Sequence, residues 1–445
     1  MRNIIGQLRL SRLFGVAGVA VAIAVFAGSG SSAAIAAGAH VRANAAASNT
    51  PGGSTPIAPG KGKAKGAPLV FGYVNDDSGA AGAFPEETAA VKATIQYVNT
   101  QLDGIAGRPI KLVACSDDAT PAEASSCATK VLQSNPIAIL GGSDFATPAS
   151  VPLFVKAGKP YLGGNAFSGP ENTSSLSFQW ASSVAIAAPS VPYAIQTLHA
   201  KSLTLMYPTG NPSALATSVL AKEVALKMGL KASAIHTVSF SATAPDLTAP
   251  MQEAKSQDPG AIIVSTGGPQ CLTVAQAHQE LGVSAPLMLP AGCFSTQLNK
   301  EGGAAYDDNV YASGSDAQAD SPDWANTPDM KLFTKVMKQY TPSTLTSPLV
   351  EFGLYGFQTV MNVRNVLNSL KPNEITSKTI VTAFRSTVNE SDVLGVPYTC
   401  KTVPVKALGG LCTVAGYIYK IENGQDRLVA GPINAAKYIT SATGF

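Results

Sequence analysis

Residues 68–118 read PLVFGYVNDDSGAAGAFPEETAAVKATIQYVNTQLDGIAGRPIKLVACSDD, a succession of strand, helix and strand. The apolar run 69–74 has the length of a buried strand, and the turn-forming residues 75–79 end it. Apolar side chains within 86–102 recur at i, i+4, i+7 and i+11, which is one face of an α-helix. The run 110–113 begins the next strand. A helix that joins two strands places them in parallel, so this stretch predicts a β-α-β unit.

The same alternation continues along the chain. Further strands are expected at 137–140, from 161, and at 203–206, 235–239, 261–264, 287–289 and 310–312. Helices are expected from Pro121 and at 147–157, 213–228, 247–257, 272–281, 328–340, 351–370 and 377–385. Residues 416–421 alternate like a hairpin strand before a turn at 422–424. The whole pattern predicts an α/β fold.

Length and composition favour two lobes with large cores. The chain has 445 residues, of which 45% are hydrophobic and 13% charged. One ordinary domain is shorter than this. The formal net charge is +3, and Lys61, Lys63 and Lys65 carry part of it on a stretch without periodicity. Because no basic folded face is expected, a nucleic-acid partner is excluded.

The N-terminus has the pattern of an export signal. Arg2, Arg9 and Arg12 precede an apolar run at 13–27, and small residues with an A-x-A site at 34–36 follow. We expect a signal at 1–37 and a disordered linker at 38–67, rich in Gly, Pro, Ala and Ser. The run is short for a membrane span, although an uncleaved anchor is the alternative. The protein is therefore expected in the periplasm, the cell envelope or the medium, either free or tethered.

The cysteines form three couples that are local in sequence. Such a pattern in an exported chain favours disulfides, although other pairings remain formally open. Metal binding is the rival interpretation, but no couple has C-x-x-C spacing and the histidines lie elsewhere, so no metal is expected. The couples are Cys115/Cys127, Cys271/Cys293 and Cys400/Cys412, and the histidines are His40, His199, His236 and His278.

The junction Gly141-Gly142-Ser143-Asp144 follows a predicted strand and precedes a helix. Backbone N–H groups at such a point can bind an anion, and ligands of open α/β sheets lie at the carboxyl ends of strands. In the alternative, Ser143 or Asp144 merely caps the helix. The loop 161–168 repeats the pattern, and glycines at 267–268 and 292 follow strands of the second half.

The chain resembles the type I periplasmic binding proteins, specifically the branched-chain amino-acid (Leu/Ile/Val) binding family of ABC transporters. The order and spacing of several segments carry this resemblance over residues 68–430. They read LVFGYVNDDSGAAG, QYVNTQLDGIAGRPIKLVACSDDATPAEA, ILGGSDFATPASVPLFVKAGKPYLGGNAFS, GAIIVSTGGPQ and AHQELGVSAPLMLPAG.

This resemblance implies two Rossmann-like α/β lobes with parallel central sheets, joined by a three-crossover hinge (the periplasmic binding protein-like I fold). Lobe 1 would comprise 68–183 and 314–390, and lobe 2 would comprise 184–313 and 391–435. Crossovers would fall near 179–188, 311–314 and 391–396. Ligand closes the hinge of such a fold. The implied ligand-binding residues are Ser143, Asp144, Asn165, Ala166, Phe167, Phe84, Asn211, Gly268 and Ala291.

One departure from the family concerns the ligand. Amino-acid binders of this family place a carboxylate for the ligand ammonium where this chain has Ala291. A buried ammonium without a partner is costly, so Asp76, Asp77 or Asp144 would have to replace that carboxylate. We therefore expect a small carboxylate or amino-acid-like solute.

The expected function is the solute-binding component of an ABC importer. It needs no cofactor, its partners are a small ligand and the transporter permease, and the chain is expected to be a monomer. A ligand-sensing ectodomain that signals to a membrane partner is the alternative. A secreted hydrolase is the third class, but no G-x-S-x-G, H-E-x-x-H or strand-linked G-x-G-x-x-G motif occurs in the mature chain. We therefore expect no enzyme.

Overall fold

The computed structural model describes residues 62–79, 83–268, 270–307, 309–342 and 351–442. The predicted export signal and the linker up to residue 61 lie outside these described residues. No described helix is both long enough and apolar enough to cross a membrane.

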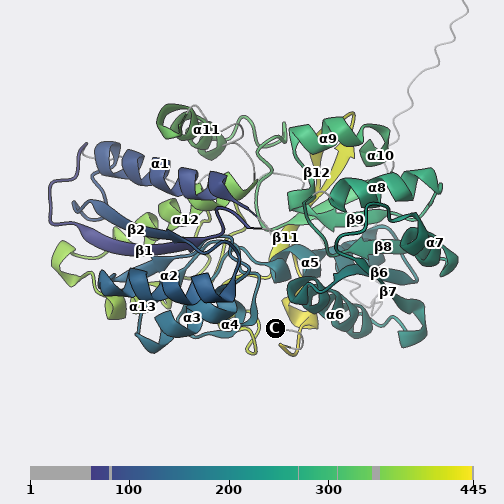
Figure 1. Ribbon diagram of the computed structural model, residues 1–445, viewed down its shortest axis with the longest axis horizontal. Coiled ribbons are helices and arrows are strands. Elements are labelled where there is room, and N and C mark those ends of the chain that lie inside the picture. The colour runs from purple at the N-terminus through teal and green to yellow at the C-terminus, as the bar shows by residue number, and fades with distance from the viewer. Residues whose placement is uncertain (1–61, 80–82, 269, 308, 343–350, 443–445) are drawn as a thin grey trace, which may run out of the picture. The chain divides into compact units, whose positions relative to one another are not determined.

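The first sheet is fully parallel and has the strand order β2-β1-β3-β4-β5 (Figure 1). The predicted β-α-β unit is confirmed, since β1 and β2 flank helix α1 and pair in register from Leu69↔Ile110 to Asn75↔Ser116. The strands are β1 (Leu69–Asn75), β2 (Ile110–Ser116), β3 (Ala138–Leu140), β4 (Tyr161–Leu162) and β5 (Ser177–Phe178).

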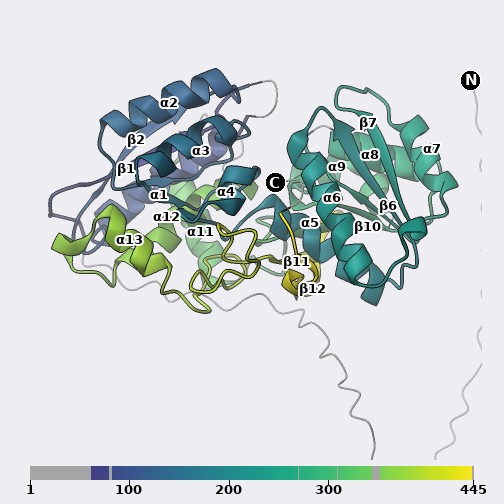
Figure 2. The same ribbon diagram turned by 90° about the horizontal axis from the view of Figure 1, so that it is seen from below.

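Helices cover both faces of this sheet, so most of its strand residues are apolar, although the edge strand β2 carries the exposed Lys111. Alternate residues of β1 point to opposite faces: Phe71 and Tyr73 join the core beneath α1 and α12, whereas Val74 joins the core beneath α2 and α3. Figure 2 shows α2 and α3 side by side on one flank. The helices are α1 (Pro85–Gln101), α2 (Pro121–Gln133), α3 (Thr147–Lys156), α4 (Gly169–Thr173), α11 (Pro328–Tyr340), α12 (Glu351–Leu367) and α13 (Ser377–Phe384).

The second sheet has the order β12-β11-β10-β9-β8-β6-β7. Its strands β6 to β10 are parallel, but β11 and β12 form an antiparallel hairpin on β10, so this sheet is mixed. The strands are β6 (Leu203–Thr209), β7 (Ile235–Ser241), β8 (Ala261–Val264), β9 (Leu287–Pro290), β10 (Val310–Gly314), β11 (Ala415–Glu422) and β12 (Gln425–Asn434).

Two helical layers also enclose the second sheet. Leu203, Leu205 and Ile263 pack beneath α5 and α6, whereas Met206 and Ile262 pack on the opposite face against α7 and α8. The helices are α5 (Ser183–Pro192), α6 (Pro212–Lys227), α7 (Thr248–Ser256), α8 (Gln270–Glu280), α9 (Thr296–Gly302) and α10 (Ala304–Asp307), with a 3-10 turn η3 (Ala291–Cys293).

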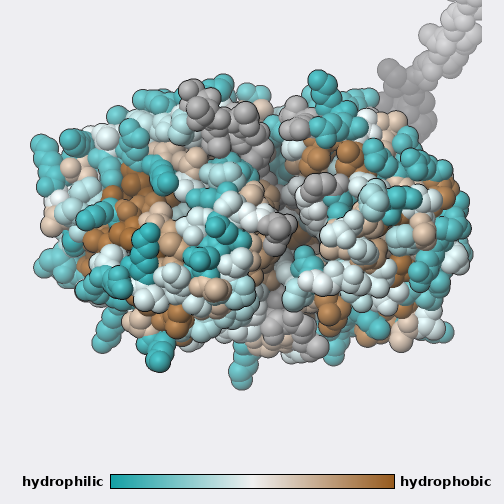
Figure 3. Space-filling view, in the orientation of Figure 1, coloured by the Kyte–Doolittle hydropathy of each residue, from teal (hydrophilic) through white to brown (hydrophobic). Residues whose placement is uncertain are grey.

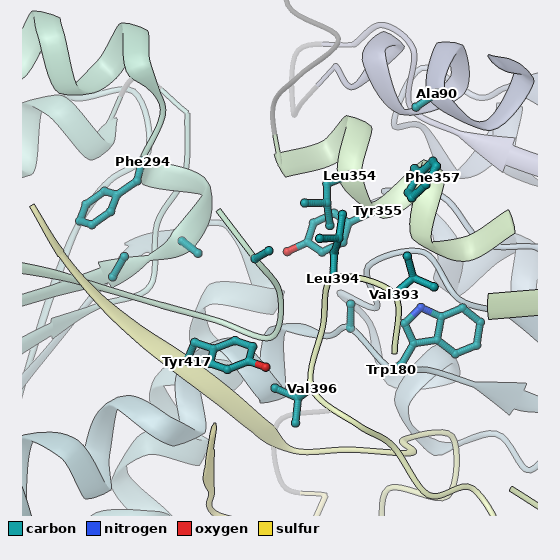
Figure 4. Close-up of a cluster of buried hydrophobic side chains, with 14 of the residues drawn as sticks. Ala90, Trp180, Phe294, Leu354, Tyr355, Phe357, Val393, Leu394, Val396 and Tyr417 are labelled. Atoms are coloured by element: carbon teal, nitrogen blue, oxygen red, sulfur yellow. The ribbon is translucent and has the colours of Figure 1, made fainter. Parts of the chain in front are cut away.

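One apolar core is continuous between the sheets. Figure 4 shows Leu394 and Val396 between Tyr355 of α12 and Tyr417 of β11, and all four side chains are buried. The hydroxyl of Tyr417 donates to the carbonyl of Gly395 at 3.3 Å. The segment around 391–396, where a crossover was predicted, therefore lies between elements of both sheets.

The three local disulfides are confirmed. Their Cα–Cα distances are 5.5 Å for Cys115–Cys127, 5.3 Å for Cys271–Cys293 and 4.5 Å for Cys400–Cys412. No described cysteine is free. The first bridge joins β2 to α2, and the second joins α8 to η3.

Two details differ from the sequence prediction. Residues 62–67, predicted as linker, pack on the first sheet's helices: Ala64 is buried, and its N–H donates to the carbonyl of Asn99 at 2.9 Å. The segment 391–412, predicted in lobe 2, makes several of its hydrogen bonds with the first half, for example from Cys412 N–H to Gln179 O at 2.8 Å. The lobe limits themselves stay a prediction.

The surface is mainly polar. Hydrophilic and neutral side chains dominate the face in Figure 3, with smaller apolar areas between them. The large hydrophobic side chains that are exposed among the described residues are Leu215, Leu226 and Val388.

Candidate functional site

The residues at the end of β1 organise the carboxyl edge of the first sheet. Asn75 Oδ1 accepts a hydrogen bond from the N–H of Ser143 at 2.9 Å. The carboxylate of Asp76 accepts from Ala119 N–H at 3.0 Å and from Phe145 N–H at 2.9 Å. The side chains of Asn75, the last residue of β1, and of Asp76, the next residue, thereby fix the loops that follow β2 and β3.

Part of the backbone predicted to hold an anion is engaged within the chain. Ser143 N–H also donates to Glu87 Oε2 at 3.0 Å, and Ala146 N–H donates to Asp144 Oδ1 at 2.6 Å. Ser143, Asp144 and Glu87 are buried. An anion at Ser143 N–H would have to displace internal acceptors, and the anion site stays a prediction. The alternative, in which Ser143 or Asp144 caps the helix, is wrong, because the N-cap of α3 is Ala146 and no side chain caps it.

The second predicted loop is held in the same way. Phe167 N–H and Ser168 N–H donate to Glu171 Oε2 at 3.1 and 3.0 Å. Asn165 and Ala166 are buried, and Ala166 N–H donates to Ala181 O at 3.2 Å. A buried carboxyl group again takes the donors that were expected to face a ligand.

These buried acids lack basic partners, since none of the salt bridges in the described part of the chain involves them. Burial, and then a hydrogen bond with Asp117, raises the pKa of Asp76 to about 8. Burial raises the pKa of Glu171 to about 7, and it also raises the pKa values of Glu87 and Asp144 well above their ordinary range. Burial therefore favours the neutral forms of these acids, and neither Asp76 nor Asp144, both of which are buried, presents an exposed carboxylate to a ligand ammonium.

Three of the aspartates form a group that sequence reasoning missed. Asp76, Asp117 and Asp144 follow three neighbouring strands and bring one oxygen each within 4.8 Å of the others. Such a group has the spacing of a cation site, but the oxygens of Asp76 already accept hydrogen bonds from Ala119 N–H and Phe145 N–H. We draw no metal assignment from it.

Four phenylalanine rings form a row at the same edge. Phe352 stacks on Phe84 at 4.2 Å between ring centroids, Phe84 lies 5.7 Å from Phe145, and Phe145 lies 4.7 Å from Phe167. All four rings are half-buried. We call this set the phenylalanine row. The sequence predicted Phe84 and Phe167. It missed Phe145, which directly follows the junction at 141–144, and Phe352, which belongs to the distant helix α12.

The predicted residues of the second half lie after β6, β8 and β9. Asn211 caps α6, with Oδ1 accepting from Ala214 N–H at 3.0 Å. Gly268 is exposed with φ +59°, a conformation that favours glycine. Ala291 is buried at the start of η3, which contacts α12, the helix of Phe352.

Ala291 packs against Gly314 of β10, since a Cβ placed on Gly314 would approach the Cβ of Ala291 to 2.6 Å. The side chain of Ala291 offers no polar group to a ligand. A separate cavity of about 570 Å³ lies between α12 and α13 and shares no residue with the predicted site.

Two α/β sheets, with the predicted ligand-binding residues in loops at the ends of their strands, are typical of two-lobed binding proteins. A model of the periplasmic binding protein family matches residues 68–402, and the chain belongs to this family. The resemblance inferred from sequence is thereby confirmed. Proteins of this family bind solutes and are not enzymes, so the chain is a solute-binding protein.

Several solved structures share the fold. A fatty acid ABC transporter substrate-binding protein from Thermomonospora curvata is 19% identical with a TM-score of 0.67, covering 87% of this chain and 99% of that one. The leucine-binding protein LivK from Thermotoga maritima is 15% identical with a TM-score of 0.63, covering 81% and 98%.

LivJ from Streptococcus pneumoniae, solved with isoleucine, is 18% identical with a TM-score of 0.62, covering 82% of this chain and 99% of that one. At such identities the likeness concerns the fold. A search of curated proteins found no match.

Proposed function

We propose that the chain is the extracytoplasmic solute-binding component of an ABC importer, and that it captures a small amino-acid-like or carboxylate solute between the strand ends of its two lobes. The family assignment carries this proposal. The similar structures described as ABC substrate-binding proteins support it. A permease is the partner that this role requires.

The proposed ligand site comprises residues of two kinds. Ser143, Asp144, Asn165, Ala166 and Ala291 are buried and shape the loops. The positions accessible to a solute are Phe84, Phe167, Asn211 and Gly268. Contact with solute is therefore expected mainly from the second group.

Hinge closure would couple binding to transport. A solute that touches both lobes favours the closed state by the difference between its affinities for the closed and open states. Asp316, which follows β10, accepts from Gln358 of α12, and Asn362 of the same helix donates to Asp392 at 2.5 Å. The segment after β10 and the segment around Asp392 are thus both hydrogen-bonded to α12, and this arrangement suits a hinge.

A thermal-shift screen tests solute capture. The purified mature chain would be scanned with amino acids and organic acids at millimolar concentration, and native mass spectrometry would detect solute carried through purification. We expect a raised Tm with at least one compound and a one-to-one complex. Absence of any shift and of any bound solute would contradict the proposal. A ligand-induced change of oligomeric state would instead favour the sensor ectodomain.

A further inference from the structure

Two segments that cross between the sheets lie against each other as a short antiparallel ribbon. Asp316, which follows β10, forms an antiparallel bridge with Gly395. Backbone hydrogen bonds of 2.7 and 3.2 Å flank this bridge on its two sides. We call residues 315–317 and 394–396 the hinge ribbon. It lies between α12, which covers the first sheet, and β11 of the second sheet (Figure 4). A change in the angle between the sheets must therefore move the ribbon against at least one of these elements.

The second sheet holds the backbone of the hinge ribbon through neutral hydroxyl groups. The hydroxyl of Tyr417 donates to Gly395 O at 3.3 Å, and that of Tyr419 donates to Asp316 O at 3.0 Å. The indole Nε1 of Trp324 donates to the Tyr419 hydroxyl at 3.0 Å. A tyrosine hydroxyl ionises near pH 10, and burial raises the pKa of Tyr419 further. This attachment is therefore insensitive to pH near neutrality.

Helix α12 holds the ribbon through carboxyl groups. Gln358 Nε2 donates to Asp316 Oδ1, and Asn362 Nδ2 donates to Asp392 Oδ1 just before the second strand of the ribbon. Both aspartates are buried. A Cβ placed on Gly395 would overlap the Asp392 carboxyl group and the Gln358 amide. The backbone of the ribbon thus lies directly on these two side chains, and a change in their charge acts on it.

Asp316 and Asp392 have no basic partner, since no salt bridge in the described part of the chain includes either. Asp392 Oδ2 is buried and has no hydrogen-bond partner among the described residues. Burial raises the pKa of Asp316 to about 7, and burial followed by the charge of Asp316 raises that of Asp392. The other titratable groups around the pair are Asp329 of α11, Glu390, Tyr398, Tyr417 and Tyr419. Ionisation therefore places two like charges in a dry site without compensation, which is costly.

We propose that the hinge ribbon is a pH-sensitive element: it stays packed on α12 while Asp316 and Asp392 are neutral, and their ionisation shifts the equilibrium between hinge angles toward arrangements in which water reaches the pair. This inference rests on the proposed function only where it assigns a hinge to these segments, and it involves no solute. Because a solute also selects among hinge angles, loss of protons from the pair changes its apparent affinity.

A simpler role for the pair is to contribute to the stability of the folded chain in its protonated form. That role predicts a pH-dependent unfolding free energy with the same inter-lobe distance at every pH. The hinge role predicts in addition a change of this distance within the folded state. A distance measurement on the folded protein therefore separates the two roles.

Double electron–electron resonance on the mature chain, dialysed free of solute, provides the test. Spin labels at Lys130→Cys on α2 and Lys222→Cys on α6 occupy exposed positions of the two halves. We expect a single population of distances at pH 5 and a second population at pH 8.5. The ratio of the second population to the first should rise at least about tenfold between these pH values, since ionisation favours the hydrated arrangement. Circular dichroism at both pH values verifies that the chain is folded.

Variants assign the effect to the pair. Asp316→Asn and Asp392→Asn keep the size of the side chain but cannot ionise, so each should reduce the change between pH 5 and pH 8.5, and the double variant should abolish it. If one single variant does not fold, the other carries the comparison. Asp426→Asn is the matched control, because burial raises the pKa of this acid of β12 to about 6 and its carboxyl group accepts from Asn299. It should respond to pH as the parent does.

Identical distance distributions at the two pH values in the parent would overturn the inference. An equal pH response in the parent and in both ribbon variants would overturn it as well, and so would a response lost only in Asp426→Asn. Solute capture survives each of these results. Failure of every compound in the thermal-shift screen, together with no carried solute, is the separate result that removes the proposed function.

Discussion

The backbone N–H of Ser143 donates to the carboxyl group of Glu87 at 3.0 Å, although 56 residues separate the two in sequence. Glu87 lies in the first turn of α1, and Ser143 lies in the loop after β3. An internal carboxyl group thus occupies the donor that resemblance assigns to a ligand carboxylate. The N–H group of Ser143 is therefore engaged within the chain.

Two substitutions of Glu87 should distinguish the contribution of its hydrogen bond with Ser143 to the unfolding free energy from the contribution of a negative charge. Burial raises the pKa of Glu87, so the group is expected to be neutral and Glu87→Gln should change the unfolding free energy little. Glu87→Ala removes an acceptor in a buried site and should cost about 1–3 kcal/mol. Urea unfolding at pH 7 measures both values. An equal loss in the two variants would show that Glu87 acts as a charge.

Stability should fall as pH rises. The pKa values of Glu171 and Asp316 are raised to about 7, that of Asp76 to about 8 and that of Asp426 to about 6, with burial as the main cause of each shift. In the unfolded chain such groups titrate near pH 4. Because the folded state binds more protons, this contribution is fully present below about pH 4 and is lost as pH rises through these folded pKa values.

We therefore expect Tm at pH 5 to exceed Tm at pH 8 by roughly 5 °C or more. Differential scanning calorimetry in buffers of equal ionic strength measures the difference. Asp316→Asn removes one of these acids and should make the dependence shallower. A Tm that rises between pH 5 and pH 8 would contradict the assignment of protonated buried acids.

Asp117→Asn should stabilise the protein at high pH. Asp117 lies beside Asp76, with one carboxyl oxygen of each within 4.8 Å, and it helps to raise the pKa of Asp76. An asparagine removes one of the two facing carboxyl groups and can still accept from Ala119 N–H, as Asp117 does at 3.2 Å. We expect a gain of about 1 kcal/mol at pH 8 and a smaller one at pH 5. Loss of stability, together with stabilisation of the parent by Ca²⁺, would indicate a cation site instead.

Loss of the Cys271–Cys293 bridge should cost about 3 kcal/mol in the chain-entropy description of disulfides. Its sequence separation of 22 exceeds the 12 of Cys115–Cys127. The variant with alanine at both Cys271 and Cys293 should therefore be less stable than the variant with alanine at both Cys115 and Cys127. Chemical denaturation of both double variants under non-reducing conditions gives the comparison. Unchanged midpoints would show that the bridges do not stabilise the folded state.

Much of the fold could be predicted because its elements carry strong periodic patterns. The unit β1-α1-β2 and the repeated strand-and-helix pairs were found in this way. Helix α4 and strand β5 were missed, since elements of five and two residues hold no full period. The packing of residues 62–67 was also missed, because their composition is that of a linker and long-range contacts with residues such as Asn99, Asp103 and Gly107 order them.

The site was predicted less completely. Phe84 and Phe167 were placed by resemblance, and both lie in the phenylalanine row. Phe352 could not be found from sequence, because its contact with Phe84 depends on how α12 packs beside α1. Glu87 has the sequence position of a solvated acid in a first helical turn, and only the N–H of Ser143 explains its burial. Long-range hydrogen bonds of this kind leave no local pattern.

The distance between the lobes during binding tests the proposed mechanism most directly. Spin labels at Lys130→Cys on α2 and Lys222→Cys on α6 lie at exposed positions, one on each half. Double electron–electron resonance would compare the free protein with the complex of whichever solute raises Tm most. Closure around the solute predicts a shorter inter-label distance in the complex. An unchanged distance distribution at saturating solute would contradict capture between the lobes.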